Sequence, residues 1–120
     1  MSVLDKVQLE PDEKKIDTWT LLYVPPKGGK YNGYLMVTNQ RLLYDAKFDV
    51  SAKGLIEEAL FVKWGSETFV AIPKSRIKHV EVKKTFFSKK VLVTLDDEAL
   101  HTFDYGMLNI DPVAAAIQQR

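Results

Sequence analysis

Cysteine is absent from this chain of 120 residues. Disulfide bonds, thiolate metal sites and a thiol nucleophile are therefore excluded. No apolar run approaches the roughly 20 residues that a helix needs to cross a bilayer, and the opening segment MSVLDKVQLEPDEKK lacks the apolar stretch of a signal peptide. A charge excess is missing too, with 17 Lys and Arg against 16 Asp and Glu, whereas nucleic-acid-binding domains are usually clearly basic. We therefore expect a cytoplasmic protein that binds no nucleic acid.

The remaining composition is that of an ordinary globular protein, with 46% hydrophobic and 28% charged residues. A chain of this length buries roughly two thirds of its unfolded surface, which is enough for one core. The chain contains no internal repeat, no low-complexity tract and no linker. We expect a single domain over residues 1–120, with an N-terminal leader at 1–14, a barrel at 15–108 and a C-terminal helix at 109–120.

Short runs rich in β-branched and aromatic residues, separated by turn residues, predict about seven strands joined mostly by hairpins. In Gly65-Ser66, a glycine opens a two-residue loop, which is typical of a type II′ hairpin turn. Residues 49–59 show no alternation, although Ser51 could cap a brief helical turn. Near the end, Asp111 as N-cap and Pro112 as first helical residue predict a short amphipathic helix. The expected strand runs are 16–24, 31–37, 41–48, 60–64, 67–72, 76–84, 91–95 and 99–105.

The segments GYLMVTNQRLLY, IPKSRIKHV and TFDY carry a family resemblance. All three resemble segments of the GRAM and bacterial pleckstrin-homology-like (PH-like) family. Residues 33–44 (GYLMVTNQRLLY) are similar to its glycine and apolar strand leading into Thr-Asn-x-Arg-Leu. Residues 72–80 (IPKSRIKHV) resemble its Ile-Pro-x-x-x-Ile-x-x-Val step, and residues 102–105 (TFDY) its late aromatic strand. The resemblance implies a mainly-β fold, a PH-like barrel of about seven antiparallel strands capped by one C-terminal α-helix. It also implies a non-catalytic interaction module.

The segment KKTFFSKK predicts a candidate contact surface at a hairpin tip, where two aromatic residues lie between two lysine pairs. Such rings could enter the interfacial layer of a membrane while the lysines meet anionic headgroups, or they could contact a protein. Alternatively, a ring packs under the barrel and the lysines only aid solubility. The candidate residues are Lys83, Lys84, Phe86, Phe87, Lys89 and Lys90.

Lys27 and Lys30 are a second candidate pair, because the loop PPKGGK combines two cations with two glycines that let backbone N–H groups approach an anion. The P-loop pattern is absent, so an ordinary surface turn is the alternative. Phosphoinositide-binding PH domains resemble one another in spaced cations on the first loop followed by a basic residue in the second strand. Lys27 and Lys30 match the first part, but residues 31–34 contain no cation.

No residue pattern predicts a catalytic site, a metal site or a cofactor. His79 and His101 lie in separate strands, each without a second histidine at metal-ligand spacing, and alternation places His101 and Asp104 on opposite faces. The acidic turn at 96–98 lacks the loop of a calcium site. We therefore expect a module that binds a protein partner or an anionic membrane surface. The alternative is a self-associating subunit, a homo-oligomer that buries Phe86 and Phe87 between copies.

Overall fold

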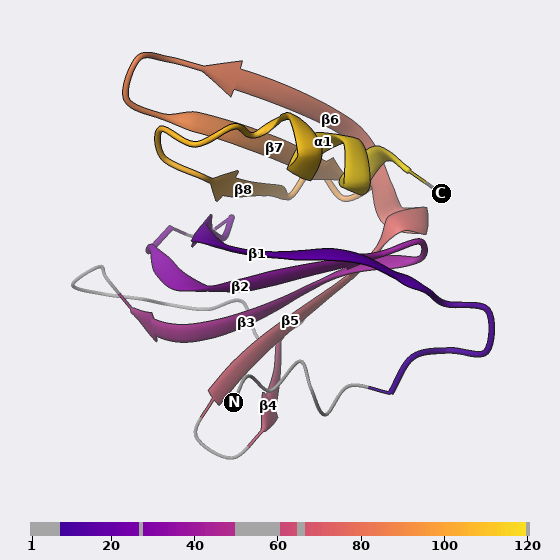
Figure 1. Cartoon of the computed structure of the whole chain (residues 1–120). Coiled ribbons are helices and arrows are strands. Elements are labelled where there is room, and N and C mark those ends of the chain that lie inside the picture. Colours follow the sequence, from indigo (N-terminus) through magenta and orange to yellow (C-terminus); the bar gives the residue numbers. More distant parts are fainter. Residues whose placement is uncertain (1–7, 27, 50–60, 65–66, 120) are drawn as a thin grey trace.

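The computed structural model describes residues 8–26, 28–49, 61–64 and 67–119. This part of the chain forms eight strands and one α-helix (Figure 1). A 3₁₀ turn, Lys74–Arg76, precedes the sixth strand. The elements are β1 (Lys15–Val24), β2 (Tyr31–Thr38), β3 (Arg41–Asp49), β4 (Phe61–Trp64), β5 (Glu67–Pro73), β6 (Ile77–Lys84), β7 (Lys89–Leu95), β8 (Leu100–Asp104) and α1 (Asp111–Gln118).

All the strands belong to one antiparallel sheet with the order β4-β5-β3-β2-β1-β8-β7-β6. The sheet bends at the end of β1, where residues 22–24 pair with β8 while residues 22 and 23 also pair with β2. Figure 1 shows the result as two layers, β1 to β5 in one and β6 to β8 in the other. The helix α1 packs against β1, β2 and β6, so it covers the open side between the two layers.

Strand alternation places one face of each layer in a common core. In β7, Val91, Val93 and Leu95 are buried while the residues between them are half-buried. Val113 and Ile117 lie four positions apart on α1, and both are buried in the same core. The mainly-β class and the capping C-terminal helix predicted from the sequence are thus confirmed. Each of the eight expected runs contains a strand, so the described sheet has one strand more than the barrel of about seven that the family resemblance implies.

The helix is held at both ends by contacts that its own sequence does not show. At its C-terminal end, the buried Lys74 ammonium donates to the carbonyl of Ala116 at 2.8 Å and also to that of Gln119. The last carbonyls of a helix lack the N–H of a further turn, and the negative end of the helix dipole favours a cation there. Lys74 therefore ties α1 to the turn before β6.

The predicted N-cap, Asp111, is wrong. The helix begins at Asp111, and the N-cap residue is Ile110, whose apolar side chain makes no capping hydrogen bond. Asn109 accounts for the shift, because its Oδ1 accepts the Asp111 N–H at 3.1 Å. The Asp111 carboxylate is consequently free to pair with Lys84 of β6, at 2.8 Å.

The hairpin predictions hold where the structure describes them. Asn39 and Gln40 link β2 to β3, and Trp64 faces Glu67 across the β4–β5 hairpin, as a two-residue loop requires. The turn type at 65–66 and the brief helical turn expected at Ser51 lie outside the described residues. The same is true of residues 1–7 of the predicted leader.

Candidate functional site

The hairpin between β6 and β7 ends in a closed four-residue turn, Thr85 to Ser88, which we call the tip. The Thr85 N–H and hydroxyl both donate to the Ser88 carbonyl, at 2.7 and 3.0 Å, and the Ser88 N–H donates to Thr85 Oγ1 at 3.0 Å. Hydroxyl side chains stabilise turns in this way because they satisfy backbone groups that the strand ladder leaves unpaired. The turn is therefore a defined structure that holds Phe86 and Phe87 at its end.

Both phenylalanines of the tip are exposed to solvent, Phe86 at 76% and Phe87 at 74%. Their rings contact each other edge to face, with centroids 4.7 Å apart and planes at 77°. Packing of a ring under the barrel, the alternative considered from the sequence, is excluded by this exposure. An exposed aromatic pair leaves a large apolar area in water, which favours burial against a partner surface.

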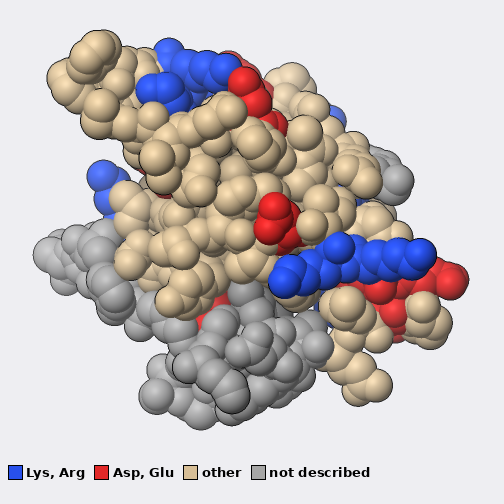
Figure 2. Space-filling model, viewed as in Figure 1, with Lys and Arg blue, Asp and Glu red and all other residues tan. Residues whose placement is uncertain are grey.

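The four predicted lysines of this segment face one another as two cross-strand pairs, Lys83 opposite Lys90 and Lys84 opposite Lys89. Like charges directly opposite each other destabilise a sheet, so this arrangement favours an anion from outside the strand pair. Two of the lysines have internal partners, since Lys84 pairs with Asp111 at 2.8 Å and Lys89 Nζ donates to the Thr85 carbonyl at 3.4 Å. In Figure 2 the tip lies in the lobe at upper left, with lysine side chains beside it.

A second pair of exposed apolar residues lies next to the tip and was missed by the sequence analysis. Met107 is 64% exposed and Leu108 59%, both in the connection from β8 to α1. This connection lies beside the start of β7, because the Gly106 carbonyl accepts the Lys89 N–H at 2.7 Å. The sequence signal was the pair Met-Leu after a glycine, where the strand pattern has ended and the helix has not begun.

The other predicted cations are not brought to the tip. Lys27 lies outside the described residues, and Lys30 is exposed just before β2. In the sheet, β1, β8 and β7 stand between β2 and β6. Lys30 is therefore not a neighbour of the tip lysines within the sheet.

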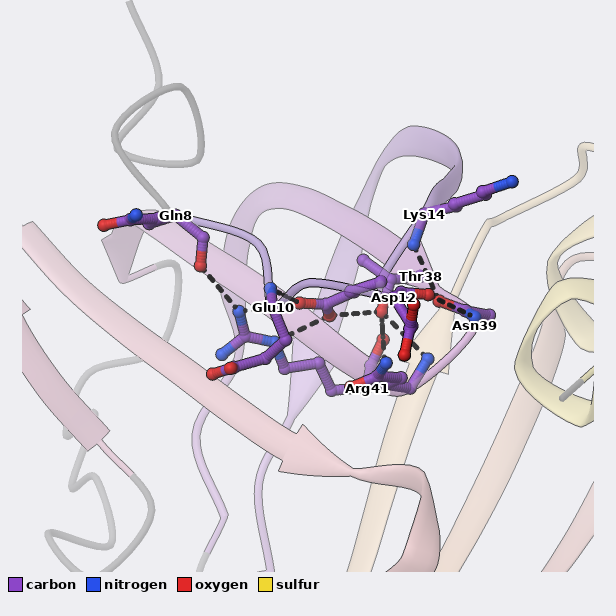
Figure 3. Close-up of polar contacts among 9 residues, drawn as sticks. Gln8, Glu10, Asp12, Lys14, Thr38, Asn39 and Arg41 are labelled. Atoms are coloured by element: carbon purple, nitrogen blue, oxygen red, sulfur yellow. Dashed lines mark hydrogen bonds and ion pairs between the residues drawn. The ribbon is translucent and has the colours of Figure 1, made fainter.

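The Thr-Asn-x-Arg segment binds residues of the predicted N-terminal leader (Figure 3). Arg41 holds the Glu13 carboxylate at two points, Nε to Oε2 at 2.8 Å and Nη2 to Oε1 at 3.0 Å. Thr38 donates its hydroxyl to the same carboxylate at 2.5 Å, and Arg41 also donates to the Gln8 carbonyl at 3.1 Å. Burial raises the pKa of Glu13, but the hydrogen bonds from Arg41 and Thr38 outweigh it, so this pKa lies below its ordinary value.

Asn39 completes this contact, which we call the N-terminal latch. Its Oδ1 accepts the Lys14 N–H at 2.7 Å, and its Nδ2 donates to the Asp12 carbonyl at 3.1 Å. The Asn39 N–H donates to the Lys14 carbonyl at 3.0 Å. The motif that carries the GRAM resemblance is therefore occupied by the chain itself and has a structural role.

His101 is fully buried in the core face of β8, where its Nδ1 lies 2.6 Å from the Tyr23 hydroxyl. Its Nε2 has no hydrogen-bond partner in the part of the chain that the structure describes. Asp104 belongs to the opposite face, as the alternation predicted. Burial lowers the pKa of His101 from 6.5 to about 4, because the charged imidazolium would lose its hydration.

This buried histidine predicts a loss of stability in mild acid. The unfolded chain takes up a proton below its ordinary pKa of 6.5, whereas the folded chain resists until about pH 4, so the stability present above pH 6.5 falls as the pH drops. Urea unfolding should show a loss of about 2 kcal/mol between pH 7 and pH 5. His101→Gln should remove most of this pH dependence, and His79→Gln, on the exposed edge strand, should retain it. An equal slope in wild type and His101→Gln would contradict the assignment.

The described residues contain neither a metal-binding cluster nor a membrane-spanning helix. No three His, Cys, Asp or Glu side chains gather there in a way that could hold a metal ion. In that same part of the chain, no helix has the length and apolar content to cross a bilayer.

Comparison with known proteins supports the fold. No family model matches this chain, and no curated protein sequence matches it. One similar solved structure is described as the crystal structure of the C-terminal domain of an unknown protein from Leishmania infantum. The two chains are 16% identical, with a TM-score of 0.61, and the match covers 89% of this chain and 84% of the other. At this identity, the likeness concerns the fold alone.

Proposed function

We propose that this protein is a non-catalytic interaction module that attaches to an anionic membrane surface through the tip. One observation carries the proposal, namely the exposed pair Phe86 and Phe87 held on a closed turn between two lysine pairs. Aromatic rings favour the interfacial layer of a bilayer, and lysines at that depth meet anionic headgroups. The rings and the lysines can thus both be satisfied by one partner, an anionic bilayer surface.

The expected strength of such a contact is that of reversible peripheral binding. Removing one phenylalanine side chain from water contributes about 1.5 to 3 kcal/mol, and each lysine near an anionic surface adds about 1 kcal/mol. The ordering of the turn costs little on binding, since the hydrogen bonds between Thr85 and Ser88 already hold it. Binding should therefore depend both on the rings and on salt.

The resemblance to the GRAM and PH-like family supports an interaction module in general terms. The order of elements, a run of antiparallel strands followed by one C-terminal helix, is compatible with that resemblance. The Thr-Asn-x-Arg motif adds no support for a ligand, because its side chains hold the N-terminal latch. The argument for a membrane therefore depends on the tip.

The first test is sedimentation with phosphatidylserine-containing and with pure phosphatidylcholine vesicles. Wild type should pellet with the anionic vesicles and lose binding as salt is raised. Phe86→Ser with Phe87→Ser should lower the partition coefficient about a hundredfold, since about 3 kcal/mol of ring burial is lost. Lys83→Gln with Lys90→Gln should lower it about thirtyfold at low salt.

Matched controls separate the tip from general surface effects. Leu100→Ser removes an exposed apolar residue elsewhere on the sheet, and Lys14→Gln with Lys15→Gln removes two exposed charges near the start of β1. Both control proteins should bind as wild type does. Absence of pelleting with either vesicle at low salt would overturn the proposal. Concentration-dependent mass in sedimentation velocity, abolished by the double serine variant, would instead identify a second copy as the partner.

A further inference from the structure

The loop between β8 and α1 forms a tight turn of its own beside the tip. The Leu108 N–H donates to the Tyr105 carbonyl at 3.2 Å, and Gly106 adopts a left-handed φ of 64°, which glycine accepts without strain. Met107 and Leu108 follow the glycine and are exposed at 64% and 59%. The turn therefore fixes two apolar side chains in solvent, as the tip does with its two rings.

Backbone and side-chain bonds join this loop to the tip. The Lys89 N–H donates to the Gly106 carbonyl at 2.7 Å, and the Lys89 carbonyl accepts the Tyr105 N–H at 2.9 Å. The Asp104 carboxylate bridges the two segments, since one oxygen accepts the Ser88 hydroxyl at 3.1 Å and the other the Gly106 N–H at 2.7 Å. The two turns are thus neighbours in one rigid unit.

Exposed apolar side chains concentrate at this end of the molecule. In the described residues, six large hydrophobic side chains are exposed, and four of them lie on these two turns. The four are Phe86, Phe87, Met107 and Leu108. A scatter of single exposed residues needs no explanation, whereas four on two bonded turns form a common surface.

Charge is distributed unevenly between the two ends of β7. Residues 83–90 and 104–111 contain four lysines and two aspartates, a net charge of +2 at the tip end. Both aspartates are engaged within the protein, Asp104 with the two turns and Asp111 with Lys84. The other end of β7 leads into the acidic turn at 96–98, whose carboxylates pair with Arg76 and Lys78. An anionic surface would therefore attract the tip end more strongly than the opposite end, where the carboxylates and their cation partners offset one another.

From this geometry we infer that Met107 and Leu108 form a second insertion loop, so that the protein contacts an anionic lipid bilayer through two bonded turns with the acidic turn pointing away. This inference rests on the proposed function and adds to it the second loop and the orientation. Two separate points of insertion fix the orientation of the protein on the bilayer, whereas a protein held by a single tip could still rotate about it. The position of Met107 and Leu108 beside the lysines is what selects a lipid surface over an uncharged apolar partner.

The test uses the natural absence of cysteine, which makes single-cysteine labelling direct. A nitrobenzoxadiazole label is placed at Phe86→Cys, Met107→Cys, Leu108→Cys or the control Ser75→Cys, which is exposed next to Arg76 at the far end of β6. With phosphatidylserine-containing vesicles, the first three labels should shift to shorter emission wavelengths and resist iodide quenching, and the control should not. An equal shift at Ser75→Cys would overturn the orientation.

An unlabelled variant checks that the dye itself does not cause insertion. Met107→Ser with Leu108→Ser should lower the partition coefficient about tenfold or more, because two apolar side chains no longer leave water. Circular dichroism and thermal unfolding should match wild type, since neither residue is buried. Wild-type binding of this variant, with the label responding only at Phe86→Cys, would overturn the inference and leave the proposed function intact. No response of the label at any site, together with no pelleting of wild type, would overturn both the inference and the proposed function.

Discussion

Replacing Gly33 with alanine is expected to lower the free energy of unfolding by more than about 3 kcal/mol. A Cβ atom at this position would lie 2.0 Å from the backbone oxygen of Asp45 and 2.9 Å from its carbonyl carbon. Both contacts are with the backbone of β3, so no side chain can rotate away. β2 pairs with β1 on one side and β3 on the other, which prevents the strand from moving aside.

The close approach at Gly33 coincides with an irregularity in the ladder. The register between β2 and β3 shifts between Asn32 and Gly33, as at a β-bulge, where glycine permits the backbones to come together. Gly106→Ala is the matched control, because Gly106 has a positive φ but no atom within 4 Å of the added Cβ. Its cost should be about 1 kcal/mol, from backbone strain alone. Urea unfolding of both variants measures the difference, and an equal cost would contradict a steric role for Gly33.

Replacing Arg41 with methionine is expected to lower the free energy of unfolding by about 3 kcal/mol. The substitution keeps most of the aliphatic stem but leaves the Glu13 carboxylate, which is 0% exposed, without its cation. A buried charge without a partner costs far more than a surface pair contributes. Glu13→Gln combined with Arg41→Met should recover part of the loss, because the double variant contains no unpaired charge.

Two measurements separate the N-terminal latch from general destabilisation. Arg76→Met breaks an exposed pair with Asp96 and Asp97 and should cost less than about 1 kcal/mol. Under native conditions, Arg41→Met should also accelerate tryptic cleavage at residues 14 and 15, which the latch holds against the β2–β3 turn. Unchanged cleavage together with unchanged stability would show that Arg41 does not hold the segment.

Most strands could be predicted from the sequence because their signals are local. Alternation such as that of Val91, Val93 and Leu95 requires only that one face of a strand be buried, and short polar breaks mark the hairpins. The two phenylalanines at the tip were predictable for the same reason, since they interrupt a basic strand pattern at a turn. Asp111 failed as an N-cap because the helix already includes it: Ile110 is the N-cap, and the Asp111 N–H is a first-turn donor that Asn109 accepts.

The roles of several polar residues were decided by contacts between segments far apart in the chain. Glu13 and Arg41 are 28 positions apart, and Tyr23 and His101 are 78 apart, so no local pattern indicates that they meet. Met107 and Leu108 lie in the candidate surface because the end of β8 pairs with the start of β7. The sequence by itself thus determined the strands, the helix and the position of two rings at a hairpin turn, through periodicity over a few residues, while the exposure of those rings came from the structure. Only the tertiary structure decided which charges are buried and which loops share a surface, because burial depends on how the sheet bends and where the helix covers it.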